Sequence, residues 1–283
     1  MRDLVGRNFL ITGANGGVGR AIAAALAARG GHLFLGCRST EVAESAAAEL
    51  RAQAGAVEVE PLVIDLASLA SVRAAADAFE ARRLPLHGLV NNAGLAGTRA
   101  VSRDGFELTF AVNHLGHFLL TRRLESALRA GAPSRIVNVA SQAHRAAKAI
   151  DFAALRKRTR TLTGVHEYAV SKLCNVLFTR ELARRWAGSG VAAFTVHPGV
   201  VATRIWRRVP QPVRWLMTRS MLSPEQGART PLYCLTAPEL AGASGGYFVR
   251  DREEAPSATA QDDALAARLW DESEVMIATA TAP

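Results

Sequence analysis

Cysteine is scarce in this sequence, which holds only Cys37, Cys174 and Cys234 among its 283 residues. Residues 1–7 contain no apolar stretch of signal-peptide length, so we expect reduced thiols in a cytoplasmic protein rather than a disulfide-bonded secreted one. The three cysteines form no CxxC pair and no Cys/His cluster. No metal site is therefore expected.

Long hydrophobic runs are also missing. The apolar run Ala21–Ala28 is far shorter than the roughly 20 residues that a membrane-spanning helix needs, so no transmembrane segment is predicted. The chain is still apolar enough to fold, because hydrophobic residues make up 49% and charged residues 21% of it. Its length, with no linker or internal repeat, predicts one domain that spans residues 1–283.

Acidic residues are in the minority. The chain has 25 Asp and Glu against 34 Lys and Arg, which gives a formal net charge of +9. Such a surface attracts anions, and the candidates are a phosphorylated cofactor, an acidic substrate and a membrane surface. Nucleic acid is not expected as a partner, because the sequence holds no recognised nucleic-acid-binding motif.

Apolar runs of strand length alternate with segments of helical periodicity. The predicted strands are Asn8–Thr12, His32–Cys37, Val57–Ile64, Leu86–Val90, Arg135–Ala140 and Val191–Val196. The predicted helices are Val18–Arg29, Glu41–Gln53, Ser71–Glu80, Phe106–Arg129 and His166–Trp186. This alternation is typical of βαβ units. We therefore predict an α/β fold with a doubly wound, Rossmann-type parallel sheet and helices on both faces.

A glycine-rich turn follows the first predicted strand and runs directly into the first predicted helix. It reads Thr12-Gly13-Ala14-Asn15-Gly16-Gly17-Val18-Gly19. Glycines there let the chain turn tightly, let the backbone approach a pyrophosphate and let the helix pack close to the strand. The N-terminus of the helix also offers unpaired N–H groups to the phosphates. The turn therefore predicts a dinucleotide site.

No acidic residue closes the second predicted strand, which ends in Gly36-Cys37-Arg38-Ser39. An acid there would bind the ribose 2′-hydroxyl of NAD and repel the 2′-phosphate of NADP. Arg38 instead offers a guanidinium that pairs with a phosphate and stacks on adenine. The alternative is a solvated surface arginine, and we favour NADP(H) as the cofactor.

Tyr168 and Lys172 are four residues apart, which places both on one face of the predicted helix His166–Trp186. A nearby ammonium stabilises a phenolate, so the lysine is expected to lower the tyrosine pKa from its usual value of about 10. The tyrosine would then exchange a proton with an alcohol or carbonyl oxygen while a nicotinamide exchanges hydride. Ser141, at the end of the predicted strand Arg135–Ala140, is expected to hydrogen-bond the reacting oxygen.

Together, these motifs resemble the short-chain dehydrogenase/reductase family in identity and order. The shared pieces are Thr12-Gly13-(x)3-Gly17-Val18-Gly19, Asp65-Leu66, Asn91-Asn92-Ala93-Gly94, Asn113, Ser141, Tyr168-(x)3-Lys172 and His197-Pro198-Gly199. The match spans about residues 7–250, and the ordered set is far more specific than any single piece.

The resemblance implies a catalytic role for four residues. Tyr168 would be the general acid/base, and Lys172 would lower its pKa and bind the nicotinamide ribose. Ser141 would hold the substrate oxygen. Asn113 would bind a water in a proton relay that passes through Lys172.

The resemblance also implies a set of residues that contact the cofactor. Within it, Asp65 would contact adenine and Thr203 the nicotinamide amide. The full set is Gly13, Asn15, Gly16, Gly17, Val18, Gly19, Arg38, Asp65, Leu66, Asn92, Ala93, Gly94, Tyr168, Lys172, Pro198, Gly199, Val201 and Thr203.

Three further stretches, residues 112–121, 171–178 and 223–230, are similar to the retinol-dehydrogenase-like branch. This resemblance implies an oxidoreductase that transfers hydride between NADP(H) and a lipophilic alcohol or carbonyl. The alternatives are a ketoreductase of secondary metabolism and a catalytically silent NADP(H)-binding protein. The intact set of Ser141, Tyr168 and Lys172 argues against a silent protein.

The stretch 198–223 is predicted to be a substrate lid, in which Trp206 and Trp215 lie among arginines and helix-breaking prolines. The alternative for this stretch is a patch that rests peripherally on a membrane. Residues 255–283 are expected to form a C-terminal tail, and His144 to lie at the polar rim of the cleft. The two long predicted helices are a candidate surface for homo-oligomerisation.

Overall fold

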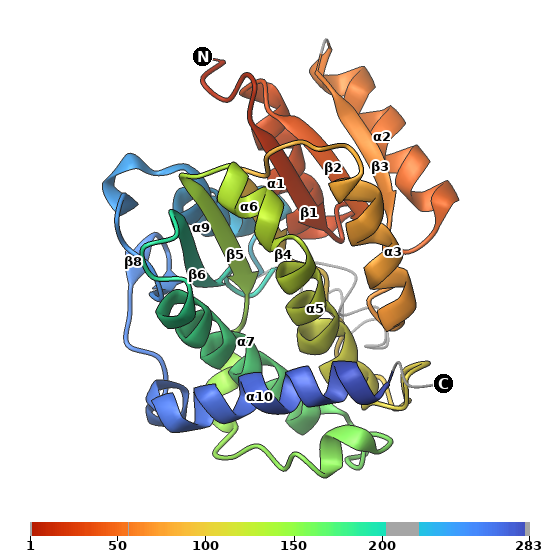
Figure 1. Cartoon of the computed structure of the whole chain (residues 1–283), viewed down its shortest axis with the longest axis vertical. Coiled ribbons are helices and arrows are strands. Elements are labelled where there is room, and N and C mark those ends of the chain that lie inside the picture. The colour runs from red at the N-terminus through yellow and green to blue at the C-terminus, as the bar shows by residue number, and fades with distance from the viewer. Residues whose placement is uncertain (1, 56, 202–220, 281–283) are drawn as a thin grey trace.

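The computed structural model describes residues 2–55, 57–201 and 221–280, and it contains an eight-stranded sheet (Figure 1). Its strands are β1 Asn8–Thr12, β2 His32–Cys37, β3 Val59–Val63, β4 Gly88–Asn91, β5 Ser134–Val139, β6 Val191–His197, β7 Tyr247–Val249 and β8 Arg252–Glu253. The order is β3-β2-β1-β4-β5-β6-β7-β8. Neighbours pair in parallel except β7 and β8, which pair antiparallel. The doubly wound prediction is confirmed, with one antiparallel edge strand added.

Helices cover both faces of the sheet (Figure 1). They include α1 Gly17–Ala28, α2 Thr40–Ala54, α3 Leu69–Glu80, α5 Gly116–Arg123, α6 Glu125–Ala130, α7 Val165–Arg185, α9 Pro224–Thr236 and α10 Asp263–Thr279. Side chains alternate along a strand, so Phe9 and Ile11 join the core under α1, α2 and α9, whereas Leu10 joins the core under α3, α5 and α7.

The single long helix predicted over Phe106–Arg129 is wrong. The chain instead forms α4 Leu108–Phe110, a π-helical turn over Ala111–Leu115, then α5 and α6. The side chain of Asn113, inside the π-turn, hydrogen-bonds the backbone of Leu95. Gly116 brings α5 so near the chain after β3 that a Cβ there would lie 2.8 Å from the Leu66 carbonyl oxygen. These tertiary contacts override the helical periodicity.

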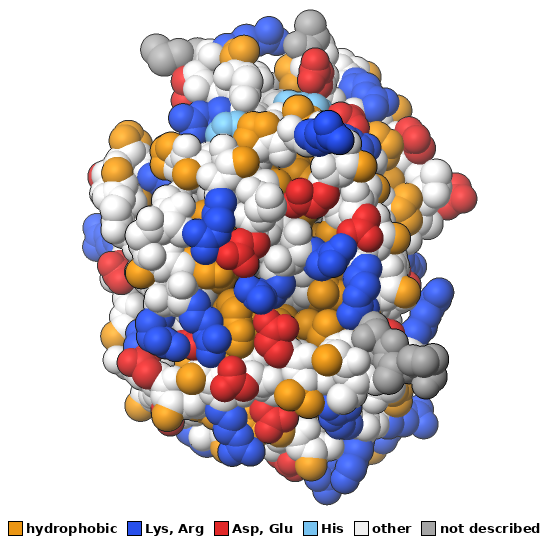
Figure 2. All heavy atoms as spheres, in the orientation of Figure 1, with side chains coloured by type: hydrophobic (Ala, Val, Ile, Leu, Met, Phe, Trp, Pro, Cys, Tyr) orange, Lys and Arg blue, Asp and Glu red, His pale blue; other side chains and the backbone are white. Residues whose placement is uncertain are grey.

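The segment expected to be a tail contains helix α10, which crosses α7 and α5 (Figure 1). Trp270 packs edge-on to Phe118 with ring centroids 4.9 Å apart, and the guanidiniums of Arg122 and Arg185 lie over its ring. Basic and acidic side chains alternate over this face in Figure 2, in keeping with ion pairs such as Arg122–Glu274. Homo-oligomerisation through the predicted helices Phe106–Arg129 and His166–Trp186 stays a prediction. It would have to use the parts of these segments that α10 does not cover.

Candidate active site

The carboxyl ends of the parallel strands bring the motifs to one edge of the sheet. β1 ends in Thr12 and β2 in Cys37, one residue before Arg38. Asp65 lies two residues beyond β3, and Ser141 two residues beyond β5. Ligands bind at this edge in open α/β sheets, so the sheet gathers residues that are far apart in the sequence.

The glycine turn between β1 and α1 is built for close approach. Gly13 has a φ of +68°, and a Cβ there would lie 3.0 Å from the Cα of Ala93. A Cβ on Gly19 would lie 2.5 Å from both Asn92 Nδ2 and the Gly13 carbonyl oxygen. The space beside Gly16 is open among the described residues, and no side chain caps the N-terminus of α1 there. The turn thus fits a phosphate-bearing group.

The ends of β1 and β4 are joined by hydrogen bonds through Thr12. Its hydroxyl accepts from the backbone N–H groups of Asn92 and Ala93, each at 3.0 Å. Its carbonyl accepts from Asn92 Nδ2 at 2.8 Å. A Cβ on Gly94 would lie 3.2 Å from Asn113 Oδ1 and 3.6 Å from Lys172 Nζ. The predicted residues Asn92, Ala93 and Gly94 therefore connect the glycine turn to Lys172.

Arg38 and Asp65 lie beyond β2 and β3, on the outer side of the glycine turn. Arg38 is exposed, and its guanidinium makes no ion pair or hydrogen bond with any residue in the described ranges. Asp65 Oδ1 accepts from the Ala67 backbone N–H at 3.1 Å, and the Asp65 carboxylate faces Arg103 at 3.9 Å. Leu66 is buried behind it.

Ser141, Tyr168 and Lys172 come together where β5 faces the first turns of α7. Tyr168 is half-buried, and the Ser141 side chain lies close enough to favour its phenolate. Lys172 Nζ lies 5.6 Å from the centroid of the Tyr168 ring and donates to the Val139 carbonyl at 2.9 Å. Asn175, one turn further along α7, donates to the same carbonyl at 3.2 Å.

Known proteins match this chain along most of its length. The model of the short chain dehydrogenase family matches residues 7–155. Retinol dehydrogenase 13 of Homo sapiens is 42% identical over 96% of this chain and 85% of its own length. The chain belongs to the short-chain dehydrogenase/reductase family. It is therefore an oxidoreductase with a dinucleotide-binding fold, similar to the retinol-dehydrogenase-like branch.

Solved structures of this family superpose on the fold. An uncharacterized protein from Mycobacterium paratuberculosis has a TM-score of 0.78 and 33% identity, covering 98% of this chain and 96% of its own. A blue fluorescent protein from a metagenomic library, solved in complex with NADPH, has a TM-score of 0.70 and 26% identity. That match covers 88% of this chain and 98% of the fluorescent protein.

Burial dominates the electrostatics of the tyrosine–lysine pair in this dehydrogenase. It raises the pKa of Tyr168, and the nearby Ser141 side chain acts in the opposite direction. Burial also lowers the pKa of Lys172 from 10.5 to about 8. The net pKa of Tyr168 is therefore raised, because loss of solvent disfavours the phenolate more than Ser141 stabilises it, and a lowering of this pKa by Lys172 stays a prediction.

Asn113 lies inside the π-turn and is fully buried. Its Oδ1 accepts from the Leu95 N–H, and its Nδ2 donates to the Leu95 carbonyl and to Ser171 Oγ, at 2.9 to 3.0 Å. These bonds use both amide hydrogens. The water in the predicted relay would therefore have to bind another atom of the residue, and the relay stays a prediction.

The chain beyond β6 reaches the same edge of the sheet. Gly199 has a φ of +86°, and a Cβ there would lie 2.4 Å from a Leu222 side-chain carbon. Val201 forms a parallel bridge with Leu222, and the Leu222 N–H donates to the Val200 carbonyl at 2.9 Å. Pro198, Gly199 and Val201 thus lie near the base of the predicted lid. Thr203 and residues 202–220 of the lid, with Trp206 and Trp215, lie outside the described residues.

Two histidines hold more of the site together than the sequence indicates. His144 is fully buried, so its predicted place at a polar rim is wrong. Its Nδ1 bonds the Ser141 carbonyl at 2.8 Å, and its Nε2 accepts from the Ser257 N–H at 3.1 Å. His117, with no predicted role, lies between Asn113 and Thr12. The available signal was its four-residue spacing from Asn113.

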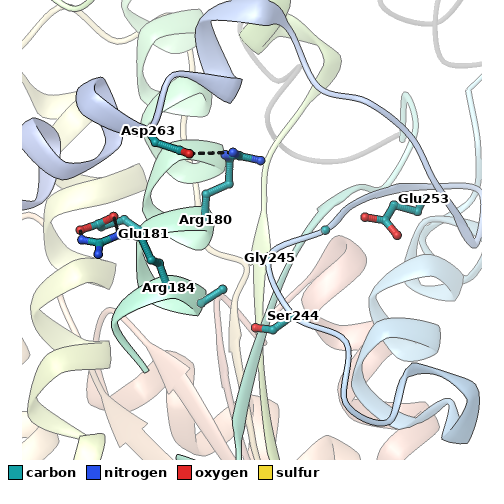
Figure 3. Close-up of a pocket in the computed structure, with 9 residues that line it drawn as sticks. Arg180, Glu181, Arg184, Ser244, Gly245, Glu253 and Asp263 are labelled. Carbon is teal, nitrogen blue, oxygen red and sulfur yellow. Dashed lines mark hydrogen bonds and ion pairs between the residues drawn. The ribbon is translucent and has the colours of Figure 1, made fainter. Parts of the chain in front are cut away.

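A pocket of about 310 Å³ lies away from these residues, between α7 and the loop before β7 (Figure 3). Charged side chains line it, including Arg180, which is paired with Asp263 at 2.7 Å. No predicted site residue borders it. In the described ranges, no helix is long and apolar enough to cross a membrane, and no three His, Cys, Asp or Glu residues are grouped to hold a metal ion.

Proposed function

We propose that this protein is an NADP(H)-dependent oxidoreductase that interconverts a lipophilic alcohol and its carbonyl compound. The observation that carries the proposal is the position of Ser141 beside Tyr168, with the buried ammonium of Lys172 5.6 Å from the centroid of the Tyr168 ring. A catalytically silent protein would have no need of a buried lysine, whose desolvation is costly.

Each residue of this trio has a part in carbonyl reduction. Hydride is the chemistry that a bound nicotinamide dinucleotide supplies. The phenol of Tyr168 donates a proton to the carbonyl oxygen, and the Ser141 hydroxyl hydrogen-bonds that oxygen as charge develops on it. The Lys172 ammonium stabilises the phenolate that remains. The raised pKa keeps Tyr168 protonated and thus suits the reductive direction.

The cofactor would lie along the edge formed by the glycine turn and the ends of β2, β3 and β4. The N–H groups around Gly13 to Gly19 would hold the pyrophosphate, and Asn92 to Gly94 would line the cleft. Asp65 would contact adenine. Arg38 supports NADP(H) over NAD(H) for two reasons. Its exposed guanidinium forms no ion pair within the described residues, and no acidic residue follows β2 directly.

Exposed apolar side chains close in the sequence to predicted site residues support a lipophilic substrate. Leu162 and Val165, shortly before Tyr168, are 84% and 63% exposed, and Val200, next to Gly199, is 54% exposed. Apolar groups around a cleft shelter apolar ligands from water. The similar human protein is named a retinol dehydrogenase. A cytoplasmic location and a lid over residues 198–223 belong to the same proposal.

A panel of carbonyl compounds tests the function directly. Purified protein is mixed with NADPH and an aliphatic aldehyde series, retinal or a steroid ketone, and NADPH consumption is followed. We expect kcat/KM to rise along the aldehyde series, since burying each CH₂ contributes about 0.8 kcal/mol. NADPH consumption that does not depend on an added carbonyl compound would contradict the proposal. So would a wild-type protein that reduces none of the carbonyl compounds in the panel.

The pH dependence of reduction should report on Lys172. Its pKa is lowered to about 8, so the ammonium is present below that pH and lost above it, while Tyr168 stays protonated. We expect kcat/KM with NADPH to fall as the pH rises through about 8. The guanidinium in Lys172→Arg keeps its charge, so the remaining activity of this variant should not fall near pH 8. A fall in kcat/KM near pH 8 in both proteins would assign the titration to another group.

A further inference from the structure

His117 lies at the start of α5 and bridges two parts of the site. It is 2% exposed. Its Nδ1 lies 3.1 Å from the main-chain carbonyl oxygen of Asn113, and its Nε2 lies 2.9 Å from Thr12 Oγ1. One ring therefore joins the π-turn of the Asn113 segment to the end of β1.

The partners of the ring fix its tautomer. The Asn113 carbonyl can only accept, so the hydrogen on that side belongs to Nδ1. Burial lowers the pKa of His117 to about 4 and keeps the ring neutral near neutral pH, which leaves a lone pair on Nε2. Thr12 must then donate to His117. The competing acceptor, the Val90 carbonyl, is further from the Thr12 hydroxyl, at 3.3 Å.

This direction decides what the Thr12 hydroxyl offers to its other neighbours. With its single hydrogen on His117, both lone pairs remain for the N–H groups of Asn92 and Ala93. Ala93 in turn packs against Gly13, and Asn92 against Gly19. His117 thus acts through Thr12 on the residues that pack against Gly13 and Gly19.

The other nitrogen of His117 acts on the tyrosine helix. It holds the carbonyl of Asn113, whose side chain donates to Ser171 Oγ at 2.9 Å. Ser171 Oγ donates to the Tyr168 carbonyl at 2.8 Å. A continuous set of buried hydrogen bonds therefore runs from Thr12 through His117 to the first turns of α7.

We propose that His117 is a positioning residue that aligns the dinucleotide-binding turn with the Tyr168 helix. The inference deepens the proposed function and rests on it for the role of Tyr168, but its effect on dinucleotide binding does not depend on the substrate. Residues in one buried network act together, so loss of His117 changes both ends.

His114 provides a matched control three residues earlier. It is equally buried, at 1% exposure, but its Nε2 bonds Ser273 on α10 at 3.1 Å, away from the glycine turn. His114→Phe and His117→Phe both remove a buried imidazole from the same segment. A loss of stability alone would therefore affect the two variants alike.

The test measures NADPH affinity by fluorescence titration without substrate, and backbone hydrogen exchange at Asn92 and Ala93 without cofactor. We expect His117→Phe to raise the Kd about tenfold and to speed exchange at both amides, because Thr12 loses its acceptor. His114→Phe should leave the Kd within about twofold. Equal Kd increases in the two variants, or an unchanged Kd in His117→Phe, would overturn the proposal.

Two milder variants keep the test decisive if His117→Phe does not fold. Gln at 117 can still offer Thr12 an acceptor, whereas Asn is too short to reach it. We expect His117→Gln to bind NADPH at least about threefold more tightly than His117→Asn. Equal affinities would count against the proposal. A wild-type protein that binds NADPH but reduces no carbonyl would refute the proposed reaction and leave this result standing.

Discussion

Replacing Tyr168 with phenylalanine is expected to lower kcat for carbonyl reduction by at least about a hundredfold, with the Kd for NADPH little changed. The aromatic ring stays and keeps its packing, but the hydroxyl group with its exchangeable proton is lost. General acid–base catalysis contributes roughly a hundred- to ten-thousandfold in rate, so this is the largest single effect that we expect. Steady-state kinetics and a fluorescence titration measure the two quantities.

Tyr233 is the matched control for that substitution. It lies on α9 and is partly exposed, and the chain has only three tyrosines in all. Tyr233→Phe should keep kcat within about twofold of the wild type. Near-normal turnover in Tyr168→Phe would remove Tyr168 from the chemistry. A large increase in the Kd for NADPH would instead indicate that the phenol binds cofactor more than it transfers protons.

Arg38→Asp is expected to move the preference in kcat/KM from NADPH towards NADH by tenfold or more. The substitution would remove the charge-assisted hydrogen bond that we propose between Arg38 and the 2′-phosphate, worth about 1.5–3 kcal/mol, and would add repulsion. It also supplies the acid that binds a ribose 2′-hydroxyl. Because about 1.4 kcal/mol corresponds to a factor of ten, even the lower estimate gives a tenfold change. Kinetics with each dinucleotide at a fixed carbonyl concentration measure the preference.

Arg268→Asp controls for the change in net charge. Arg268 is exposed on α10, where its side chain is 64% accessible. If the net positive charge of the protein attracts NADPH, both variants should bind it more weakly. If Arg38 contacts the 2′-phosphate, only Arg38→Asp should change the preference. A wild-type enzyme that prefers NADH would refute the interpretation of the turn after β2.

The parallel sheet is predictable because its strands are short apolar runs with abrupt ends. The predicted bounds of Asn8–Thr12 and His32–Cys37 agree with β1 and β2 at both ends. β7 has only three residues and β8 two, too few to show a period. The apolar positions of α10 do follow helical spacing, and Asp262 caps its first turn, so this helix had a signal in the sequence.

The site is predictable in its residues and less so in their environment. Because strand ends share an edge, the sequence could place Ser141 near Tyr168. It could not show how far burial shifts the two pKa values, because burial depends on residues such as Val139 and Asn175 that pack around the lysine. Nor could it place His117 against Thr12, 105 positions earlier in the chain.

The bridge between Val201 and Leu222 has a consequence for how such an enzyme diversifies. It fixes both ends of the intervening segment at one point beside the sheet. Closing a longer loop costs little additional entropy, about 0.6 kcal/mol for each doubling of its length. Insertions, deletions or whole exchanged segments can therefore accumulate between these two residues while the strands keep their register. Selection can then alter this segment, which we propose to be a substrate lid, without rebuilding the residues that we assign to the chemistry.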